Sequence, residues 1–393
     1  MNVRVKPRVT VIFNRDFEGA EADPENKARE DIKDIADNIV AVLARHGYQA
    51  MGLGITEDIP LAIRSLEELA PAVVFNLCES IRSDNRFEGL LPLLLDLKGI
   101  PYTGSDAFPL SLALHKDKTK EVLRARGVPT PAAVLLDDPD TSRVTLDLPL
   151  IVKPAREDAS VGICSASVVR DRQALDDRVE YVLAHYRQPV LVEQYIEGRE
   201  IYVSLLERPG DGPQMFPFFE IDFSDMPSDR PRIVSFEGKW VEDSVEYRGT
   251  RPVRCEGMSP ALRARVAETA LAAFEAMGLR DYARVDIRLA PDGVPYVIDV
   301  NPNCDLSDVA GGFSKAARAG GLSYEDVVLR LVELALSRRL DADTIAKRPS
   351  ASGTRTSAAG ARARRRQEIS RRSERSGSQS SPAASRSRTR FTT

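Results

Sequence analysis

Two aspartates and an asparagine in the C-terminal half of the chain have the chemistry of a magnesium site. They lie in the stretch RVDIRLAPDGVPYVIDVNPN, where an Asp-Gly pair typical of a tight hairpin separates two apolar runs. Such a hairpin brings Asp286 opposite Asp299 and puts Asn301 on the same face as Asp299. Facing carboxylates are destabilising unless a cation lies between them, and Mg²⁺ prefers such oxygen ligands when it also holds phosphates. The alternative, two surface aspartates, fits poorly with the apolar strand around Asp299.

A lysine followed by a short loop has the chemistry of a phosphate site. Lys153 ends a short apolar strand and precedes the loop REDASVGI at residues 156–163. Its ammonium could face phosphate oxygens, while the backbone N–H groups of Ser160, Val161 and Gly162 wrap over them. Considered alone, this segment could equally be a surface loop with a solvated lysine.

A third segment combines carboxylates with an apolar turn in a way that suits a nucleoside. It reads VLVEQYIEGRE, in which a strand ends at Glu193 and a second carboxylate follows at Glu200. We predict that Glu193 meets the edge of an adenine, Ile196 its face, and Glu200 the ribose hydroxyls. The alternative is a solvated turn between two strands.

The N-terminal part must position these groups through a regular alternation of strands and helices. Apolar β-branched runs predict strands at 9–14, 48–54 and 72–76, and helical spacing predicts helices at 26–46 and 57–69. This β-α-β-α-β order predicts a parallel sheet with helices on its faces.

The rest of the chain is predicted to mix helices with strands that carry the candidate site residues. The helices end at glycines or precede loops, and the last two strands form the hairpin described above. In chain order, these elements are a helix at 116–126, a strand at 150–153, a helix at 173–187, strands at 190–194, 199–206 and 215–221, a helix at 260–277, and strands at 283–289 and 295–300.

Composition places the chain among soluble globular proteins. Its 393 residues suggest two to three domains, and 42% hydrophobic residues are enough for a sizeable core. Four cysteines far apart in the sequence exclude a disulfide scaffold and a zinc knuckle, and they fit a reducing cytoplasm. Since apolar runs stay far below the roughly 18 residues that span a bilayer, we expect a cytoplasmic protein with no membrane partner.

The C-terminal segment 347–393 differs from the rest of the chain. It holds 13 Lys and Arg against two acidic residues, while the preceding 346 residues carry a net charge of −15. With so few large apolar residues, we predict that this segment is disordered. Nucleic-acid binding through the tail is a weak alternative to a solubilising role, because aromatic residues are almost absent from it.

Taken together and in this order, the segments resemble the ATP-grasp superfamily, most closely its D-alanine–D-alanine ligase-like branch. The resemblance covers about residues 70–345. The segments that carry it are VFNLCE (74–79), GIPYTGSD (99–106), LHKDKTKEVL (114–123), GVPTP (127–131), LIVKPAREDASVG (150–162), VEQYIEGRE (192–200) and RVDIRLAPDGVPYVIDVNPN (284–303).

The resemblance implies an α/β chain with the ATP-grasp fold. Its expected parts are an N-terminal parallel βαβ domain at 1–114, a central α+β lid domain at 115–198, a C-terminal α+β domain with the metal site at 199–346, and the basic tail at 347–393. In this family ATP lies between two antiparallel sheets, one from each of the last two folded domains.

The resemblance also implies roles for individual residues. On the phosphates it places Lys116 and Lys153, and, as a weaker match, Lys239; Glu157 and residues 160–162 belong to the loop above them. Adenine and ribose would contact Glu193, Ile196 and Glu200. Asp286, Asp299 and Asn301 would bind two Mg²⁺ ions, or Mn²⁺ in their place, and Arg284 would stabilise the transferring phosphoryl group.

The activity implied is that of an ADP-forming ligase that joins a small-molecule carboxylate to an amine through an acyl phosphate. True D-alanine–D-alanine ligases carry a histidine after the third strand, whereas this chain has CESIRSDNRFEG there, so we expect a different substrate pair. Polar contacts to that substrate are predicted, against the alternative of solvated loop residues, from Glu79, Arg82, Arg86, Asn303 and Asp305.

Other readings remain open at this point. The chain could be a catalytically idle ATP-binding regulator, although such a protein need not keep Lys116, Lys153 and the metal ligands. It could also bind nucleic acid through its tail. The sequence leaves open whether the protein is a homodimer.

Overall fold

The computed structural model describes residues 6–15 and 32–346. The described residues up to Asp341 form one compact unit. The predicted tail at 347–393 and the first residues of the helix expected at 26–46 lie outside the described residues. The expectation of a disordered tail therefore stays a prediction.

The N-terminal sheet is parallel, as the sequence predicts. It consists of β1 (Arg8–Asn14), β2 (Gln49–Ile55) and β3 (Val73–Asn76) in the order β2-β1-β3. The neighbouring strands share one direction because a helix returns the chain after each of the first two.

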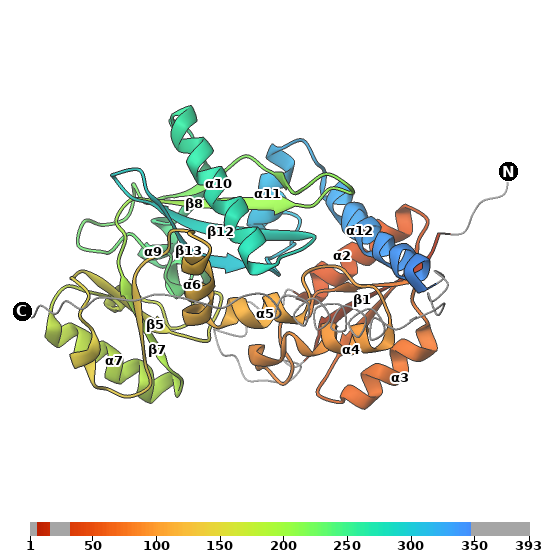
Figure 1. The fold of residues 1–393 in the computed structure, drawn as a ribbon, viewed down its shortest axis with the longest axis horizontal. Helices are drawn as coiled ribbons and strands as arrows, with labels where there is room; N and C mark the ends of the chain where they lie inside the picture. The colour runs from red at the N-terminus through yellow and green to blue at the C-terminus, as the bar shows by residue number, and fades with distance from the viewer. Residues whose placement is uncertain (1–5, 16–31, 347–393) are drawn as a thin grey trace, which may run out of the picture. The chain divides into compact units, whose positions relative to one another are not determined.

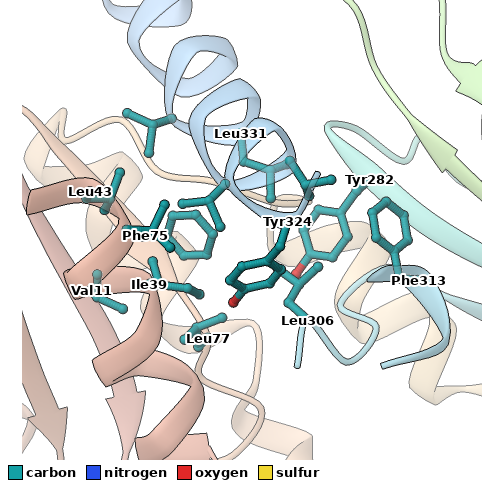
Figure 2. Packing of buried hydrophobic residues seen from close by; sticks show 14 of the residues in the cluster. Val11, Ile39, Leu43, Phe75, Leu77, Tyr282, Leu306, Phe313, Tyr324 and Leu331 are labelled. Atoms are coloured by element: carbon teal, nitrogen blue, oxygen red, sulfur yellow. The ribbon is translucent and has the colours of Figure 1, made fainter. Parts of the chain in front are cut away.

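Alternation along the strands separates the two faces of this sheet. Val9 and Val11 of β1 pack with α2 (Ile32–Arg45) and α12 (Tyr324–Ala346), as Figure 2 shows around Val11. Ile12 faces the other way, toward α3 (Ile59–Leu69) and α4 (Leu90–Lys98). The C-terminal helix thus completes the core of the N-terminal sheet, a long-range contact that local spacing does not reveal.

The central sheet is antiparallel and has four strands. Its order is β4 (Ala133–Leu136), β7 (Val190–Gln194), β5 (Leu150–Pro154) and β6 (Val168–Val169). Helix α7 (Arg172–Tyr186) packs on it through buried leucines and valines, and Asp171 caps the helix by accepting from the backbone N–H of Ala174.

A larger sheet follows, and helix α10 (Pro260–Met277) lies across it (Figure 1). Its strand order is β11 (Arg251–Arg254), β10 (Phe219–Asp222), β8 (Arg199–Leu206), β12 (Tyr282–Leu289) and β13 (Pro295–Asn301), with β9 (Gln214–Met215) beside β8. The prediction of one strand at 215–221 is wrong, because the segment divides into β9 and β10. Pro217 between them has no N–H for a sheet ladder.

The predicted hairpin of β12 and β13 is confirmed. The turn is closed by the N–H of Gly293, which donates to Ala290 over 2.9 Å, and by the Asp292 carboxylate, which accepts from the N–H of Val294 over 3.0 Å. Gly293 has φ +81°, a conformation that side chains disfavour. The Asp-Gly turn therefore sets the register of the pairs next to it, from Leu289 opposite Pro295 to Ile287 opposite Val297. Beyond Ile287 an irregularity shifts the pairing by one residue, so that Asp286 lies opposite Asp299.

Short helices complete the unit between these sheets. They are α5 (Ala107–Leu114), α6 (Lys116–Ala125), α8 (Phe236–Trp240), α9 (Val245–Arg248) and α11 (Gly312–Ala319). Across residues 6–15 and 32–346, helices long and apolar enough to span a bilayer are lacking.

Candidate active site

A pocket of about 570 Å³ opens between the central sheet and the larger sheet. Most of the predicted site residues line it, and they reach it from the two sheets, from α6 and α8, and from the loops after β5 and β13. These lining residues are Lys116, Lys153, Glu157, Ser160, Val161, Glu193, Ile196, Glu200, Lys239, Arg284, Asp286, Asp299, Asn301 and Asp305. The lining does not include Gly162, Glu79, Arg82, Arg86 and Asn303.

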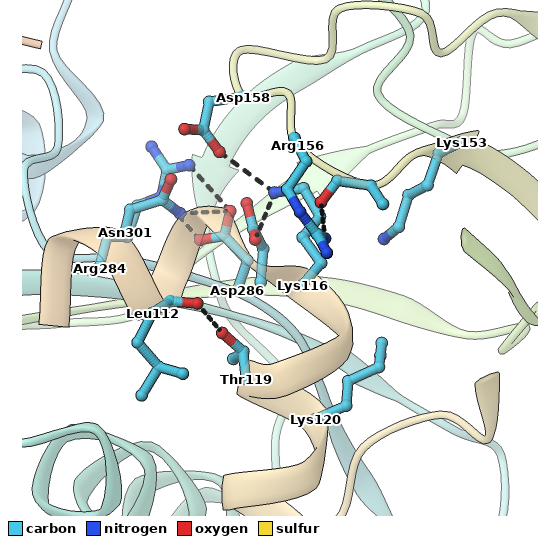
Figure 3. Close-up of polar contacts among 12 residues, drawn as sticks. Leu112, Lys116, Thr119, Lys120, Lys153, Arg156, Asp158, Arg284, Asp286 and Asn301 are labelled. Carbon is cyan, nitrogen blue, oxygen red and sulfur yellow. Dashed lines mark hydrogen bonds and ion pairs between the residues drawn. The ribbon is translucent and has the colours of Figure 1, made fainter. Parts of the chain in front are cut away.

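The two predicted aspartates face each other across the hairpin, as expected. Asp286 pairs with Asp299 in the register of β12 and β13. Arg284 donates two hydrogen bonds to Asp286, over 2.7 and 2.8 Å, and Lys116 lies 3.2 Å from Asp299 (Figure 3). Each carboxylate thus has a protein cation of its own, which offsets the repulsion that the sequence predicted.

Burial and charge act differently on the two carboxyl groups. Burial raises the pKa of Asp286, although Arg284 opposes this effect. Burial would also raise the pKa of Asp299, but Lys116 and Lys153 overcome it and hold that pKa below its usual value. Asp299 is therefore the more firmly ionised of the pair.

A buried triad of two lysines and a glutamate lies at the junction of α6, β5 and β7. The Glu193 carboxylate, 3% exposed, receives Lys153 at one oxygen and Lys120 at the other, each at 2.8 Å. Burial alone would raise the pKa of Glu193, but the two lysines lower it to about 2. Lys120 loses more to burial than it gains from Glu193, which lowers its pKa to about 8.

The loop after β5 is folded against the segment that carries α8. The Trp240 indole N–H donates to the carbonyl of Ala159 and the Ser160 hydroxyl donates to the carbonyl of Val234, both over 3.0 Å. Gly162 has φ +73°, and a Cβ there would come within 2.5 Å of the Pro154 ring. The sequence Ser-Val-Gly thus suits a backbone that lies close to its own strand.

The same loop contributes a carboxylate that the sequence analysis missed. Asp158 lies 3.1 Å from the ammonium of Lys116, which is nine-tenths buried. Burial lowers the pKa of Lys116, but Asp299 and Asp158 more than compensate and raise it. An acidic residue inside a loop thought to bind phosphate carries no obvious signal in the sequence.

The second carboxylate predicted to contact a nucleoside, Glu200, also lines the pocket. Glu200 is 5% exposed, forms an ion pair with Arg288 at 2.7 Å and accepts from the Tyr202 hydroxyl over 3.0 Å. The apolar side chain of Ile196 is buried nearby in the lining. That these residues contact adenine and ribose stays a prediction.

Lys239 lies on α8, lines the pocket and is exposed. Its ammonium is 5.1 Å from the centre of the Trp240 ring. Surrounding protein and the charge of Arg284 lower the pKa of Lys239. The side chain lies where a negative group could replace solvent around it.

The arginines predicted to contact substrate lie at the surface instead. The Arg82 side chain is 71% exposed and lies 3.3 Å from Glu57. Arg86 is 67% exposed and bonds to Asp84 two residues earlier. Their positions outside the lining favour the alternative of solvated loop residues.

Asn303 makes part-buried contacts that connect the loop after β3 to β12. Its amide donates to Glu88 over 2.9 Å and accepts from the Tyr282 hydroxyl over 2.8 Å. Burial raises the pKa of Glu88 well above its usual value, although Asn303 opposes the shift. Asp305, in contrast, accepts from the N–H of Ser307 at the pocket wall.

Two residues could have been found by spacing alone. Lys120 follows Lys116 by one helical turn on the predicted helix and so shares its face. Arg288 shares one face of its strand with Arg284 and Asp286. In both cases the spacing was visible in the sequence, but the partner carboxylate was not.

The donor set on β12 and β13 fits a magnesium ion that also binds phosphate oxygens. Asp286, Asp299 and Asn301 supply two carboxylates and an amide to the pocket wall. Within the described ranges there is no group of three His, Cys, Asp or Glu side chains that could hold a metal by itself. Phosphate or water would have to complete the coordination.

Comparison with known proteins supports the same family. Residues 132–333 match the family model described as D-ala D-ala ligase C-terminus. The D-alanine–D-alanine ligase of Chromohalobacter salexigens is 31% identical over 303 residues, covering 75% of this chain and 86% of that protein. The chain belongs to the D-alanine–D-alanine ligase family. An uncharacterized protein of Sinorhizobium fredii, y4sG, is 32% identical over 314 residues, covering 77% of this chain and 88% of that protein.

Solved structures agree with the fold of this family. The D-alanine–D-alanine ligase of Bacillus anthracis, in a structure with ATP, has a TM-score of 0.66 and 23% identity, covering 86% of this chain and 99% of that one. The ligase of Coxiella burnetii has a TM-score of 0.64 and 19% identity, covering 87% and 97%. The expected ATP-grasp fold is thus confirmed.

Proposed function

We propose that this protein is an ATP-dependent, ADP-forming ligase that joins a small carboxylic acid to an amine. The observation that carries this proposal is the pocket between the two antiparallel sheets. It combines Lys116 and Lys153 with Asp286 and Asp299 on facing walls, in a chain of the D-alanine–D-alanine ligase family. Cations and carboxylates arranged in this way suit a bound nucleoside triphosphate with its metal ion.

The first chemical step is the activation of the acid. A carboxylate oxygen attacks the γ-phosphorus of ATP, the bond to the β-phosphate oxygen breaks, and ADP leaves. Lys116, Lys153 and Arg284 neutralise the charge that spreads over the phosphoryl oxygens. Because each of these cations has a carboxylate partner in the protein, its position does not depend on the phosphates.

Magnesium would be held by Asp286, Asp299 and Asn301, and when bound it would neutralise phosphate charge. Two ions, or Mn²⁺ in their place, belong to the same proposal. In the free protein Arg284 and Lys116 contact these carboxylates, so they stand near the positions that bound cations would take.

The second step forms the new bond. The amine attacks the carbonyl carbon of the acyl phosphate, the tetrahedral intermediate collapses, and inorganic phosphate leaves as the amine loses a proton. Water would compete with the amine, so the pocket must be covered. The loop at 156–163, held by Trp240 and Ser160, is well placed to cover it.

The substrate pair is proposed to differ from two D-alanines. The loop after β3 reads CESIRSDNRFEG and lacks the histidine that ligases of this branch carry there. The part-buried contact between Asn303 and Glu88 also belongs to this loop. We infer an amino acid, or an acid that resembles one, as the activated substrate.

An ADP-release screen over paired L- and D-amino acids, with products identified by mass, tests the proposal. We expect ADP release that depends on both an acid and an amine, and a product whose mass equals their sum less water. Tight ATP binding without ADP release for every pair would instead support the idle regulator. Failure to bind ATP at all would overturn the proposed site.

A further inference from the structure

Lys120 lies behind the pocket wall and contacts neither the pocket nor solvent. Its ammonium, 4% exposed, is 2.8 Å from one oxygen of Glu193 and donates to the Thr130 hydroxyl over 2.9 Å. Thr130 in turn donates to the carbonyl of Val297 on β13 over 2.8 Å. Helix α6 is thereby joined to the strand that also carries Asp299.

The net charge of this triad determines how strongly this wall of the pocket attracts an anion. Lys153 lines the pocket and is 2.8 Å from the other oxygen of Glu193. Two lysines and one glutamate leave a net positive charge, whereas Lys153 and Glu193 alone would form a neutral pair. In a buried setting, an unscreened charge of this kind has a large effect on a nearby anion.

We propose that Lys120 is a positioning residue that neutralises Glu193 and so leaves the charge of Lys153 available to a polyphosphate. This inference rests on the proposed ATP site but assigns a function to a residue outside it. Lys120 acts through Glu193 and does not touch the nucleotide.

The central experiment compares the binding of inorganic tripolyphosphate and of adenosine to Lys120→Met. Methionine keeps most of the length of the side chain and removes its charge. We expect the Kd for tripolyphosphate to rise at least tenfold and the Kd for adenosine to change less than threefold. A purely structural role would weaken both ligands together and would overturn the proposal.

A double variant sharpens the test. Lys120→Met with Glu193→Gln removes both charges and restores the net charge at Lys153. We expect the Kd for tripolyphosphate to return to within about threefold of the wild type, as for compensating buried charges. Absence of this recovery would show that Lys120 does not act through the charge of Glu193.

Controls separate folding from binding. Lys118→Met removes an exposed lysine of the same helix, which pairs with Glu121 at 2.9 Å, and should leave both affinities unchanged. If Lys120→Met does not fold, Lys120→Gln keeps a hydrogen-bond donor without the charge and allows the same comparison. Wild-type protein that binds neither tripolyphosphate nor ATP would overturn the proposed function. Equal binding by wild type and variant would overturn only the role of Lys120.

Discussion

The end of the pocket where we propose that phosphate binds (the phosphate end) and the loop at 78–89 are organised in different ways. At the phosphate end, Lys116, Lys153 and Glu193 are at most 9% exposed and each has an ionic partner. In the loop, Arg82 and Arg86 are about two-thirds or more exposed and pair with carboxylates beside them. The phosphate end thus holds buried charged side chains with fixed partners, whereas the loop holds exposed charged side chains that can change partners.

This difference indicates which part of the site can vary to change the substrates and which part cannot. Removing one partner of a buried ion pair costs about 3–5 kcal/mol because it leaves a buried charge uncompensated, so the phosphate end tolerates little change. Exposed side chains at the loop are free to vary, because screening by water makes their ion pairs weak. A family that keeps its nucleotide chemistry while changing its substrates would place its variation in such a loop.

The largest effect is expected at the phosphate end, from Lys153→Met. Removing a cation that would face the transferring phosphoryl group should lower turnover at least a hundredfold. Stability should fall only moderately, because Lys120 still pairs with Glu193. ADP release measured beside thermal melting tests this, and wild-type turnover in a folded variant would remove β5 from the active site.

Asp299→Asn should also lower magnesium-dependent turnover, by roughly tenfold to a hundredfold, because it removes a negative metal ligand. Repulsion between the facing carboxylates, considered alone, would make this variant more stable than the wild type, but the ion pair with Lys116 reverses that expectation. The pKa of Asp299 lies below its usual value, so the fold favours the charged form and gains stability from it at neutral pH. We expect the variant to melt a few degrees lower at pH 7.

The difference in melting should shrink with acid. The stabilisation from Asp299 is present above its ordinary pKa of about 3.9 and is lost as the pH falls through the lower value in the folded protein. Melting curves of both proteins between pH 7 and pH 3 measure this. A variant that is more stable than the wild type at pH 7 would mean that repulsion from Asp286 outweighs the pair with Lys116.

The sequence predicted the strands and the turn, because the spacing of apolar residues and the residue types of a turn are local features. The Asp-Gly pair predicted the turn, and the β-branched run at β1 predicted a strand of the parallel sheet. That Asp286 lies opposite Asp299 depends also on a one-residue shift of the register beyond Ile287, which the sequence did not reveal. The position of Lys153 at a strand end follows from the same local pattern.

The ion-pair partners and the packing of distant segments were not predicted, because they depend on residues far apart in the chain. Glu193 looked like a free carboxylate, because its partner Lys120 lies 73 positions earlier on α6. The packing of α12 on the N-terminal sheet joins opposite ends of the chain. For Arg82 and Arg86, charge alone did not reveal that nearby acids would pair with them at the surface.

Asn303→Ala should have an intermediate effect and would show whether the contact between Asn303 and the loop at 78–89 contributes to catalysis. The change removes the bonds to Glu88 and Tyr282 and leaves a half-buried carboxyl without this donor. We expect kcat/KM for the acid to fall about tenfold while the KM for ATP stays within threefold. An equal rise in the KM for ATP would mean that the two ends are not separable. Asn85→Ala, on the same loop with only a long contact of 3.4 Å to the carbonyl of Arg156, is the matched control.

The smallest effect is expected from the double variant Arg82→Ala and Arg86→Ala. Both side chains are exposed, and their ion pairs with Glu57 and Asp84 lie in water, so their loss should change neither melting by more than about a degree nor kcat/KM by more than threefold. Because the sequence suggested that these arginines bind the substrate, this measurement separates the two interpretations. A tenfold loss of kcat/KM confined to one substrate would mean that the loop turns inward during catalysis. The loop at 78–89 would then form a second wall of the binding site. Its contrast with the phosphate end would hold only without bound substrate.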